Sequence, residues 1–160
     1  VQLLTGSKSA GRNVVMIGGG LVGCETALYL ARQGSSVTIV EALGDILSSG
    51  HPVPHMNRMM LIDMLKNNGV KIITDSALLE VEDQGAVIID SHFRQSALPA
   101  DTVGIAVGFD SNRALYDSMR AKTVELYLVG DAEDASDVMN AIWSAYEVAM
   151  NIKWKDPLPF

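Results

Sequence analysis

Three consecutive glycines separate two regularly patterned stretches in NVVMIGGGLVGCETALYLARQGSSVTIVEA, which covers residues 13–42. The apolar run at residues 13–17 is typical of a strand buried on both faces. From Leu21 the apolar residues recur at helical spacing, and the β-branched run at residues 36–40 predicts a second strand ending at Glu41. A strand, a helix and a strand in this order predict a right-handed βαβ unit, and therefore an α/β fold with a parallel sheet.

The glycines have the spacing G-x-G-x-x-G and lie between the predicted strand and the helix. In this position the first glycine permits a tight turn, the second lets a pyrophosphate approach the backbone, and the third lets the helix pack closely. The helix N-terminus adds unpaired N–H groups and a positive dipole end, both of which favour phosphate. The turn therefore predicts a dinucleotide site, with cofactor-binding residues Gly18, Gly19, Gly20, Leu21, Val22 and Gly23.

Glu41 lies where a carboxylate accepts hydrogen bonds from the ribose of an adenosine. The same charge repels a 2′-phosphate, and residues 41–57 contain no lysine or arginine. The sequence thus favours NADH over NADPH, with Glu41 and Ala42 at the adenosine end. Three alternatives stay open. FAD is bound by the same glycine signature, and a glycine-rich turn of another α/β protein would leave Glu41 merely solvated. The third alternative is a non-catalytic dinucleotide-binding module.

Composition and charge exclude several function classes. The 160 residues have a formal net charge of −7 without a lysine or arginine cluster, so neither nucleic acid nor an anionic membrane is a predicted partner. Cys24 is the only cysteine, which excludes an intrachain disulfide and fits a reducing cytoplasm. His51 and His55 share one loop without a third ligand nearby, so no metal site is predicted. No apolar run reaches the length of a membrane span.

The rest of the chain predicts further layers of the same fold. Short alternating stretches between residues 77 and 98 indicate a β-meander. Methionines 56, 59, 60 and 64 have helical spacing and indicate core or interdomain packing. The last predicted helix has an inner face of Val138, Ala141, Ile142, Ala145 and Ala149. The other predicted elements are helices at 56–67 and 136–152, strands at 70–74, 101–107 (buried, ending at Gly108) and 125–131, and a less regular segment at 109–123.

Four stretches together resemble a known family: VVMIGGGLVGCETALYLARQGSSVTIVEA, NNGVKIIT, LPADTVGIAVG and LYLVGDAEDASDVMNAIWSAYEVA. They are similar to the C-terminal part of multidomain NADH:flavin oxidoreductases, the group of 2,4-dienoyl-CoA reductase, enoate reductase and trimethylamine dehydrogenase. In that group an FMN barrel and an iron–sulfur cluster are joined to a module like that of disulfide reductases, in which an NAD domain is inserted into an FAD domain.

The resemblance implies a domain division. Residues 1–12 would be a linker, residues 13–108 a Rossmann-like three-layer NAD(H) domain with a β-meander crossover, and residues 109–160 the end of an FAD domain. The chain would be a segment that binds NADH weakly and is inactive alone. Its partners would be the FAD-binding and barrel domains of a parent enzyme, which delivers hydride from NADH through FAD to an FMN site that reduces activated C=C bonds.

The resemblance also implies further site residues. Ala106, Val107 and Gly108 would line the nicotinamide side, and Glu25 would lie near the flavin–nicotinamide contact. The alternative for Glu25 is to complement the dipole in the first turn of its helix. Gly130 and Asp131 look like a flavin-contacting motif, but the acids that follow depart from the family pattern and indicate, as the alternative, an ordinary acidic helix start.

Overall fold

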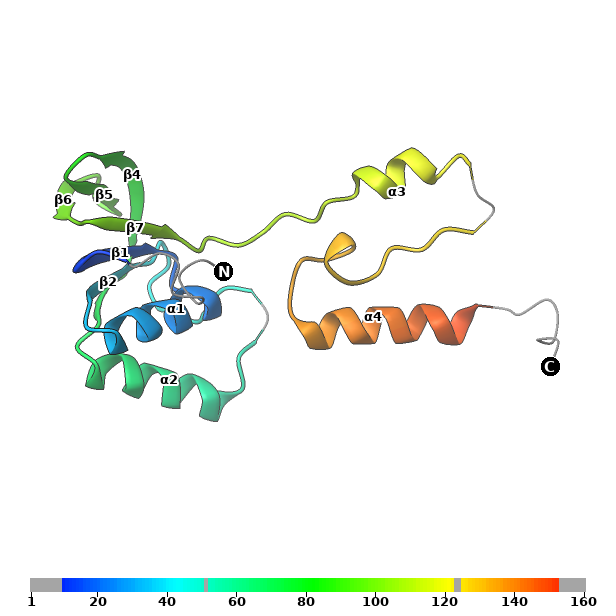
Figure 1. Cartoon of the computed structure of the whole chain (residues 1–160), viewed down its shortest axis with the longest axis horizontal. Coiled ribbons are helices and arrows are strands. Elements are labelled where there is room, and N and C mark those ends of the chain that lie inside the picture. Colours follow the sequence, from blue (N-terminus) through cyan, green and yellow to red (C-terminus); the bar gives the residue numbers. More distant parts are fainter. Residues whose placement is uncertain (1–9, 51, 123–124, 153–160) are drawn as a thin grey trace. The chain divides into compact units, whose positions relative to one another are not determined.

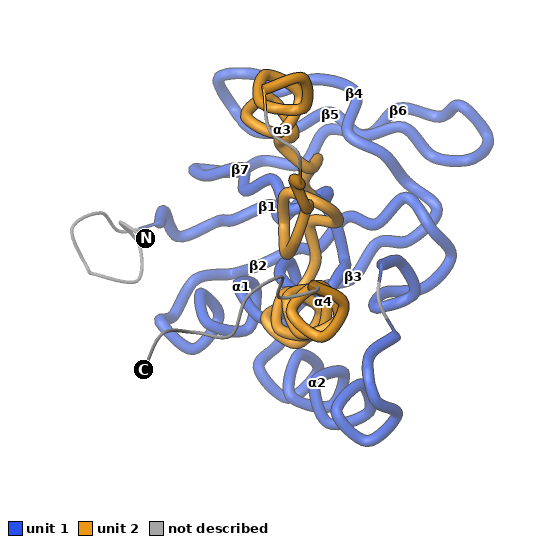
Figure 2. Tube along the Cα trace, turned by 90° about the vertical axis from the view of Figure 1, so that its right-hand side faces the viewer, with its two compact units in different colours: residues 1–108 blue, residues 109–160 orange. Residues whose placement is uncertain are grey.

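The computed structural model describes residues 10–50, 52–122 and 125–152. The chain divides into two compact units, residues 1–108 and residues 109–160 (Figure 2).

The first unit is built around a parallel sheet with the strand order β3-β2-β1-β7 (Figure 1). Helices α1 and α2 cover one face of this sheet, and an antiparallel β-meander with the order β4-β5-β6 lies over the other. The sheet strands are β1 (Asn13–Ile17), β2 (Ser36–Val40), β3 (Lys71–Ile73) and β7 (Thr102–Ile105). The other elements are α1 (Leu21–Arg32), α2 (His55–Asn67), β4 (Ser76–Glu82), β5 (Gly85–Asp90) and β6 (Gln95–Pro99).

The side chains of β1 alternate between the two faces of the sheet and so pack against both neighbouring layers. Val14 and Met16 belong to the core cluster on the helix side, whereas Val15 and Ile17 belong to the cluster on the meander side. All four side chains are buried, which explains why β1 reads as a continuous apolar run and not as an alternating one. The predicted three-layer α/β fold with a parallel sheet and a β-meander is therefore confirmed.

The register of the sheet brings three connections to one edge. Ile17 pairs with Val40 on one side and with Ile105 on the other, so these three strands end level with one another. The residues that follow them are Gly18, Glu41 and Ala106. In open parallel sheets this carboxyl edge is where ligands bind.

The strand β7 differs from its prediction. It ends at Ile105 instead of continuing to residue 108, and its residues are half-buried or exposed. The reason is its place at the edge of the sheet, because β1 is its sheet neighbour on one side and no described strand pairs with the other. The buried strand predicted here is therefore wrong in both its length and its burial.

The second unit holds α3 (Ala114–Met119), a 3-10 turn η1 (Gly130–Ala132) and α4 (Val138–Asn151). The strand predicted at residues 125–131 is wrong, because the described part of this segment has no strand partner and ends in η1. The Asp137 carboxylate caps α4 by accepting a bond of 2.8 Å from the Asn140 N–H. The α3 segment, expected to be irregular, forms a short helix.

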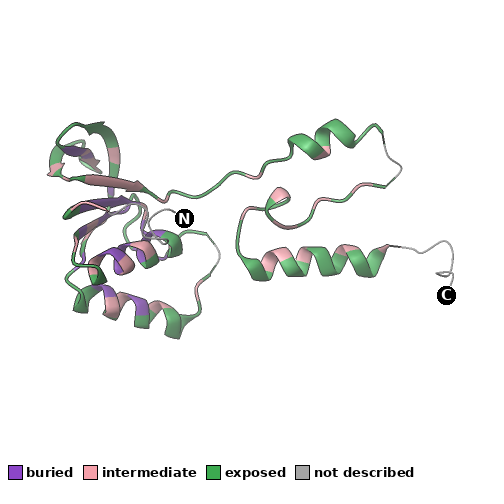
Figure 3. Ribbon diagram, viewed as in Figure 1, coloured by how far each residue is buried: buried purple, intermediate pink, exposed green. Residues whose placement is uncertain are grey.

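The predicted inner face of α4 is not buried within this unit. Val138 is 76% exposed and Ile142 is 63% exposed, and no residue of α4 is buried (Figure 3). Methionines of α2 show a similar departure, since Met56, Met59 and Met60 are exposed and only Met64 packs partly against the core. Three of the four are therefore not core residues, and interdomain packing stays a prediction for them.

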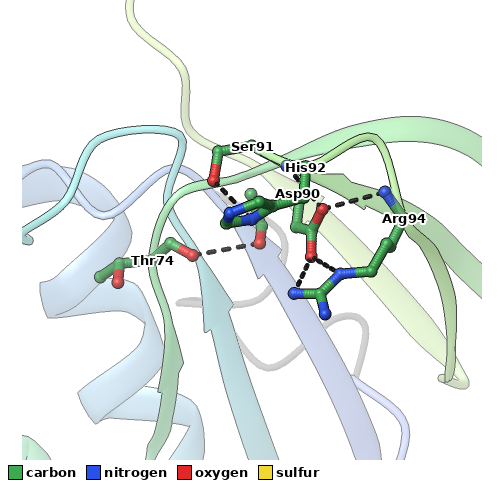
Figure 4. A network of polar contacts seen from close by, with 6 residues as sticks. Thr74, Asp90, Ser91, His92 and Arg94 are labelled. Carbon is green, nitrogen blue, oxygen red and sulfur yellow. Dashed lines mark hydrogen bonds and ion pairs between the residues drawn. The ribbon is translucent and has the colours of Figure 1, made fainter.

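The turn between β5 and β6 is organised by the carboxylate of Asp90 (Figure 4). Its Oδ1 accepts the backbone N–H groups of His92 and Arg94 at 2.8 and 2.9 Å, and its Oδ2 accepts the Arg94 guanidinium Nε at 2.8 Å. The backbone N–H of Arg94 is the largest cause that lowers the pKa of Asp90 below 3.8, and the Arg94 side chain and the His92 N–H act in the same direction.

We predict that the pKa of Asp90 stays below its ordinary value when the Arg94 side chain is removed. In Arg94→Ala the pKa of Asp90 should rise only partly towards its ordinary value, because both backbone donors remain. The stabilisation that the depressed pKa contributes is present at neutral pH and is lost as the pH falls below 3.8 through the folded-state pKa. Carbon-detected NMR titration of the Asp90 carboxyl group measures this, and an ordinary pKa in Arg94→Ala would contradict the backbone assignment.

Candidate dinucleotide-binding site

The first and third positions of the motif must be glycine for steric reasons. Gly18 has φ +100°, and a Cβ there would lie 2.3 Å from the carbonyl oxygen of Ala106. A Cβ on Gly23 would lie 2.0 Å from the carbonyl oxygen of Gly18, so α1 packs directly on the turn. Neither position can hold a side chain without a shift of the backbone.

The second glycine of the motif has a different environment. A Cβ on Gly20 would meet only the Ser49 Oγ within 4 Å, at 3.7 Å. Gly20 is the N-cap of α1 and offers no side-chain cap, and the first bond back to it is made by the Cys24 N–H at 2.9 Å. The space over Gly20 is therefore open next to the first turn of α1, whose N–H groups have no partner within the helix, and such a space accommodates a phosphate group.

Glu41 lies against the same turn. It is 7% exposed, its Oε2 accepts the Gly19 N–H at 2.6 Å, and its Oε1 accepts the Leu43 N–H at 2.8 Å. The carboxylate therefore both closes the glycine turn and begins the next loop. Ala42, which follows it, is exposed.

The segment after β7 meets the turn mainly through Ala106, and the backbone nitrogen of Val107 would lie 3.3 Å from a Cβ on Gly18. The Ala106 N–H donates to the Ile17 carbonyl at 2.7 Å, and its Cβ would be 3.4 Å from a Cβ on Gly23. Val107 is 70% exposed and Gly108 has φ +106°, so the chain leaves the sheet here. The structure thus brings Ala106 to the glycine turn.

Gly130 and Asp131 belong to the second unit. The Gly130 N–H donates to Ser144 Oγ at 2.8 Å, which holds η1 against α4. Asp131 is exposed, and its Oδ1 accepts the Ser136 N–H at 3.5 Å. Their predicted contact with a flavin stays a prediction.

Glu25 lies on the exposed surface of α1, and the first turn of that helix contains no acidic residue. The alternative prediction was that Glu25 complements the helix dipole from the first turn of α1. It is wrong, because Glu25 lies beyond that turn. Its proximity to a flavin stays a prediction.

Four residues near the turn carry no sequence signature and were missed. Ile46 and Leu47 are buried beside Gly19, and Ser49 reaches the space over Gly20. Arg58 forms an ion pair with Asp45 and donates to the Ile46 carbonyl at 3.1 Å. This arginine lies one position beyond the stretch whose lack of basic residues favours NADH, so the fold brings a cation to the loop after Glu41 that the local sequence does not predict.

Cys24 is fully buried in the core cluster between α1 and the sheet, which confirms its predicted role as a small core residue. Burial raises the pKa of its thiol to about 12, and the negative charges of Glu41 and Glu25 act in the same direction. The thiol is therefore protonated at neutral pH and is a poor nucleophile.

The described residues show neither a metal-binding cluster nor a helix that could span a membrane. No group of three His, Cys, Asp or Glu side chains there is placed to hold a metal ion, and His51 lies outside the described residues. Within the same part of the chain, no helix has the length and apolar character needed to cross a membrane.

Comparison with known proteins defines the class. Residues 2–152 match the pyridine nucleotide-disulphide oxidoreductase family, and the chain belongs to that family. Its resemblance to the C-terminal region of NADH:flavin oxidoreductases is also confirmed.

Individual relatives are reductases and oxidases. A cinnamate reductase of Clostridium sporogenes is 44% identical over 151 residues, covering 94% of this chain and 23% of the relative. An NADH oxidase of Thermoanaerobacter brockii is 34% identical over 140 residues, covering 87% of this chain and 21% of the relative. The solved structure of a 2-naphthoyl-CoA reductase with 2-naphthoyl-CoA matches with a TM-score of 0.82 and 28% identity, over 96% of this chain and 23% of that one. The chain thus spans about a quarter of the length of these relatives.

Proposed function

We propose that this chain is the NADH-binding part of a larger flavoprotein oxidoreductase. The observations that carry the proposal are the open space at Gly20, the N-cap of α1, and the buried carboxylate of Glu41, which accepts the N–H of the neighbouring Gly19. In a member of the pyridine nucleotide-disulphide oxidoreductase family, this space fits a pyrophosphate and the carboxylate fits an unphosphorylated ribose.

In this proposal the chain itself binds and orients the dinucleotide. The glycine turn holds the two phosphates, Glu41 and Ala42 hold the adenosine end, and the segment Ala106 to Gly108 flanks the nicotinamide. Bound NADH supplies a hydride, and the reaction class rests on that cofactor and not on a catalytic side chain of this segment.

The proposed acceptor is an FAD shared with sequence outside this chain, near Gly130, Asp131 and Glu25. Electrons would continue to an FMN site in a barrel domain that also holds an iron–sulfur cluster, and there reduce an activated C=C bond. The relatives called cinnamate reductase and NADH oxidase, of which this chain spans about a quarter, support an oxidoreductase with further domains.

Removal of the Glu41 carboxylate tests the adenosine end. Glu41→Ala should weaken NADH binding about tenfold, because a charge-assisted hydrogen bond to the ribose is lost, and should narrow the preference for NADH over NADPH. Calorimetric titration of both nucleotides measures it. The ratio of the NADH and NADPH affinities is the more specific measurement, because a general loss of stability would weaken the binding of both nucleotides equally.

The matched control is Glu80→Ala, which removes an exposed carboxylate from β4 in the meander. It should leave both affinities unchanged. An unaltered NADH affinity in Glu41→Ala would remove Glu41 from the site. A purified wild-type chain that is yellow, with flavin absorption that NADH does not displace, would favour FAD in the glycine turn instead.

A further inference from the structure

The peptide group between Gly19 and Gly20 is held by groups on both sides of it. Its carbonyl oxygen accepts the Leu47 N–H at 2.8 Å and the Cys24 thiol at 3.3 Å. The N–H of Gly19, one peptide earlier, is fixed by Glu41 at 2.6 Å. Because a trans peptide is planar, the Gly20 N–H points away from this anchored carbonyl, and it donates to no acceptor within the described part of the chain.

Leu47 can make its bond because of an unusual backbone conformation. It has φ +56°, in the left-handed region that side chains rarely adopt, and its side chain is only 7% exposed. Burial in the same core cluster as Cys24 holds the residue in this conformation. The loop after Glu41 and the glycine turn are therefore interlocked by a contact that neither local sequence predicts.

In its contact with the Gly19 carbonyl, Cys24 is the hydrogen-bond donor. Its thiol keeps its proton at neutral pH, because burial raises its pKa to about 12, so the S–H group can donate to the Gly19 carbonyl. The donor comes from α1, whereas Leu47 comes from the loop, so two separate elements fix one carbonyl.

We propose that Leu47 and Cys24 are positioning residues of the pyrophosphate site: they orient the Gly19–Gly20 peptide so that the Gly20 N–H faces the bound phosphate. Neither residue needs to touch the dinucleotide. The proposal rests on the proposed function, since it concerns the same site.

Cys24→Ala in the full chain tests the thiol contact, with Cys24→Ser as the conservative variant that retains a donor. NMR titrations with ADP and with adenosine separate pyrophosphate binding from the rest of the site. We expect Cys24→Ala to weaken ADP binding about threefold and to leave adenosine unchanged, and Cys24→Ser to restore ADP binding. Val37→Ala, which removes a buried side chain from the same cluster without touching the turn, should change neither.

Amide hydrogen exchange tests the Leu47 contact directly. The Leu47 N–H should exchange slowly although it lies in a loop, and the Gly20 N–H should exchange rapidly until ADP is added. A rapidly exchanging Leu47 N–H, or a Cys24→Ala variant with unchanged ADP binding or an equal loss for both ligands, would overturn the proposal. Failure of the proposed function gives a different result, because then the wild-type chain binds neither ADP nor NADH.

Discussion

Gly20→Val should abolish measurable NADH binding while the chain stays folded. A Cβ at this position enters a space where only the Ser49 hydroxyl lies within 4 Å, so the valine side chain takes the place of the phosphate. We expect a loss of at least about 100-fold in calorimetric affinity. The free energy of unfolding should fall by only about 1 kcal/mol, because the extended backbone at this N-cap admits valine and the cost is that of a poorer N-cap residue than glycine.

Gly34→Ala is the matched control for this result. Gly34 lies beyond the other end of α1, with φ +94° and nothing within 4 Å of a Cβ, so alanine there costs conformational strain of about 1 kcal/mol. Both variants should therefore unfold at similar temperatures, yet only Gly20→Val should lose the ability to bind NADH. Equal NADH affinities in the two variants would show that the pyrophosphate lies elsewhere.

The first unit was predictable because local pattern and tertiary structure agree there. The predicted helix at 56–67 is α2 within one residue, and the glycine turn falls between β1 and α1 as expected. Most of its elements also have their packing partners within the same 108 residues, so periodicity was sufficient except at the edge strand β7 and at the exposed methionines of α2. The meander was found from its alternation and from the turn before Gly85.

The second unit shows where such reasoning fails. Residues 125–131 have the composition of a strand, but a strand needs a hydrogen-bonding neighbour, and none is paired with the described part of this segment. The helix α4 was predicted correctly, because its Asp137 cap and its periodicity are local. Its predicted inner face was assigned to an interior that the unit does not form, and Val138 and Ile142 of that face are exposed.

For the site, the sequence identified the residues that are fixed by chain geometry and missed those that the fold brings in. Gly18, Gly23 and Glu41 follow strands or begin a helix, so spacing was enough to place them together. Leu47 and Arg58 reach the site from a loop and from α2, and no motif marks such positions. The charge argument for NADH, which counted only adjacent residues, therefore missed Arg58.

Gly23→Ala should have the largest effect on stability. A Cβ at this position would lie 2.0 Å from the Gly18 carbonyl oxygen, a backbone atom that cannot rotate away, so either α1 or the turn must shift. Overpacking of this kind costs about 3 kcal/mol, which would lower the melting temperature of a unit of this size by about 15 °C. Thermal unfolding followed by circular dichroism measures it.

Gly34→Ala serves again as the control, because it makes the same substitution next to the same helix without a clash. Its cost is strain alone, so its melting temperature should fall by about 4–8 °C, clearly less than that of Gly23→Ala. If the two variants had the same melting temperature, backbone conformational preference and not close packing would explain why the third position of the motif is glycine. If Gly23→Ala were instead as stable as the wild type, α1 would have to sit farther from the turn than described, and the donors at its N-terminus could not border the space at Gly20.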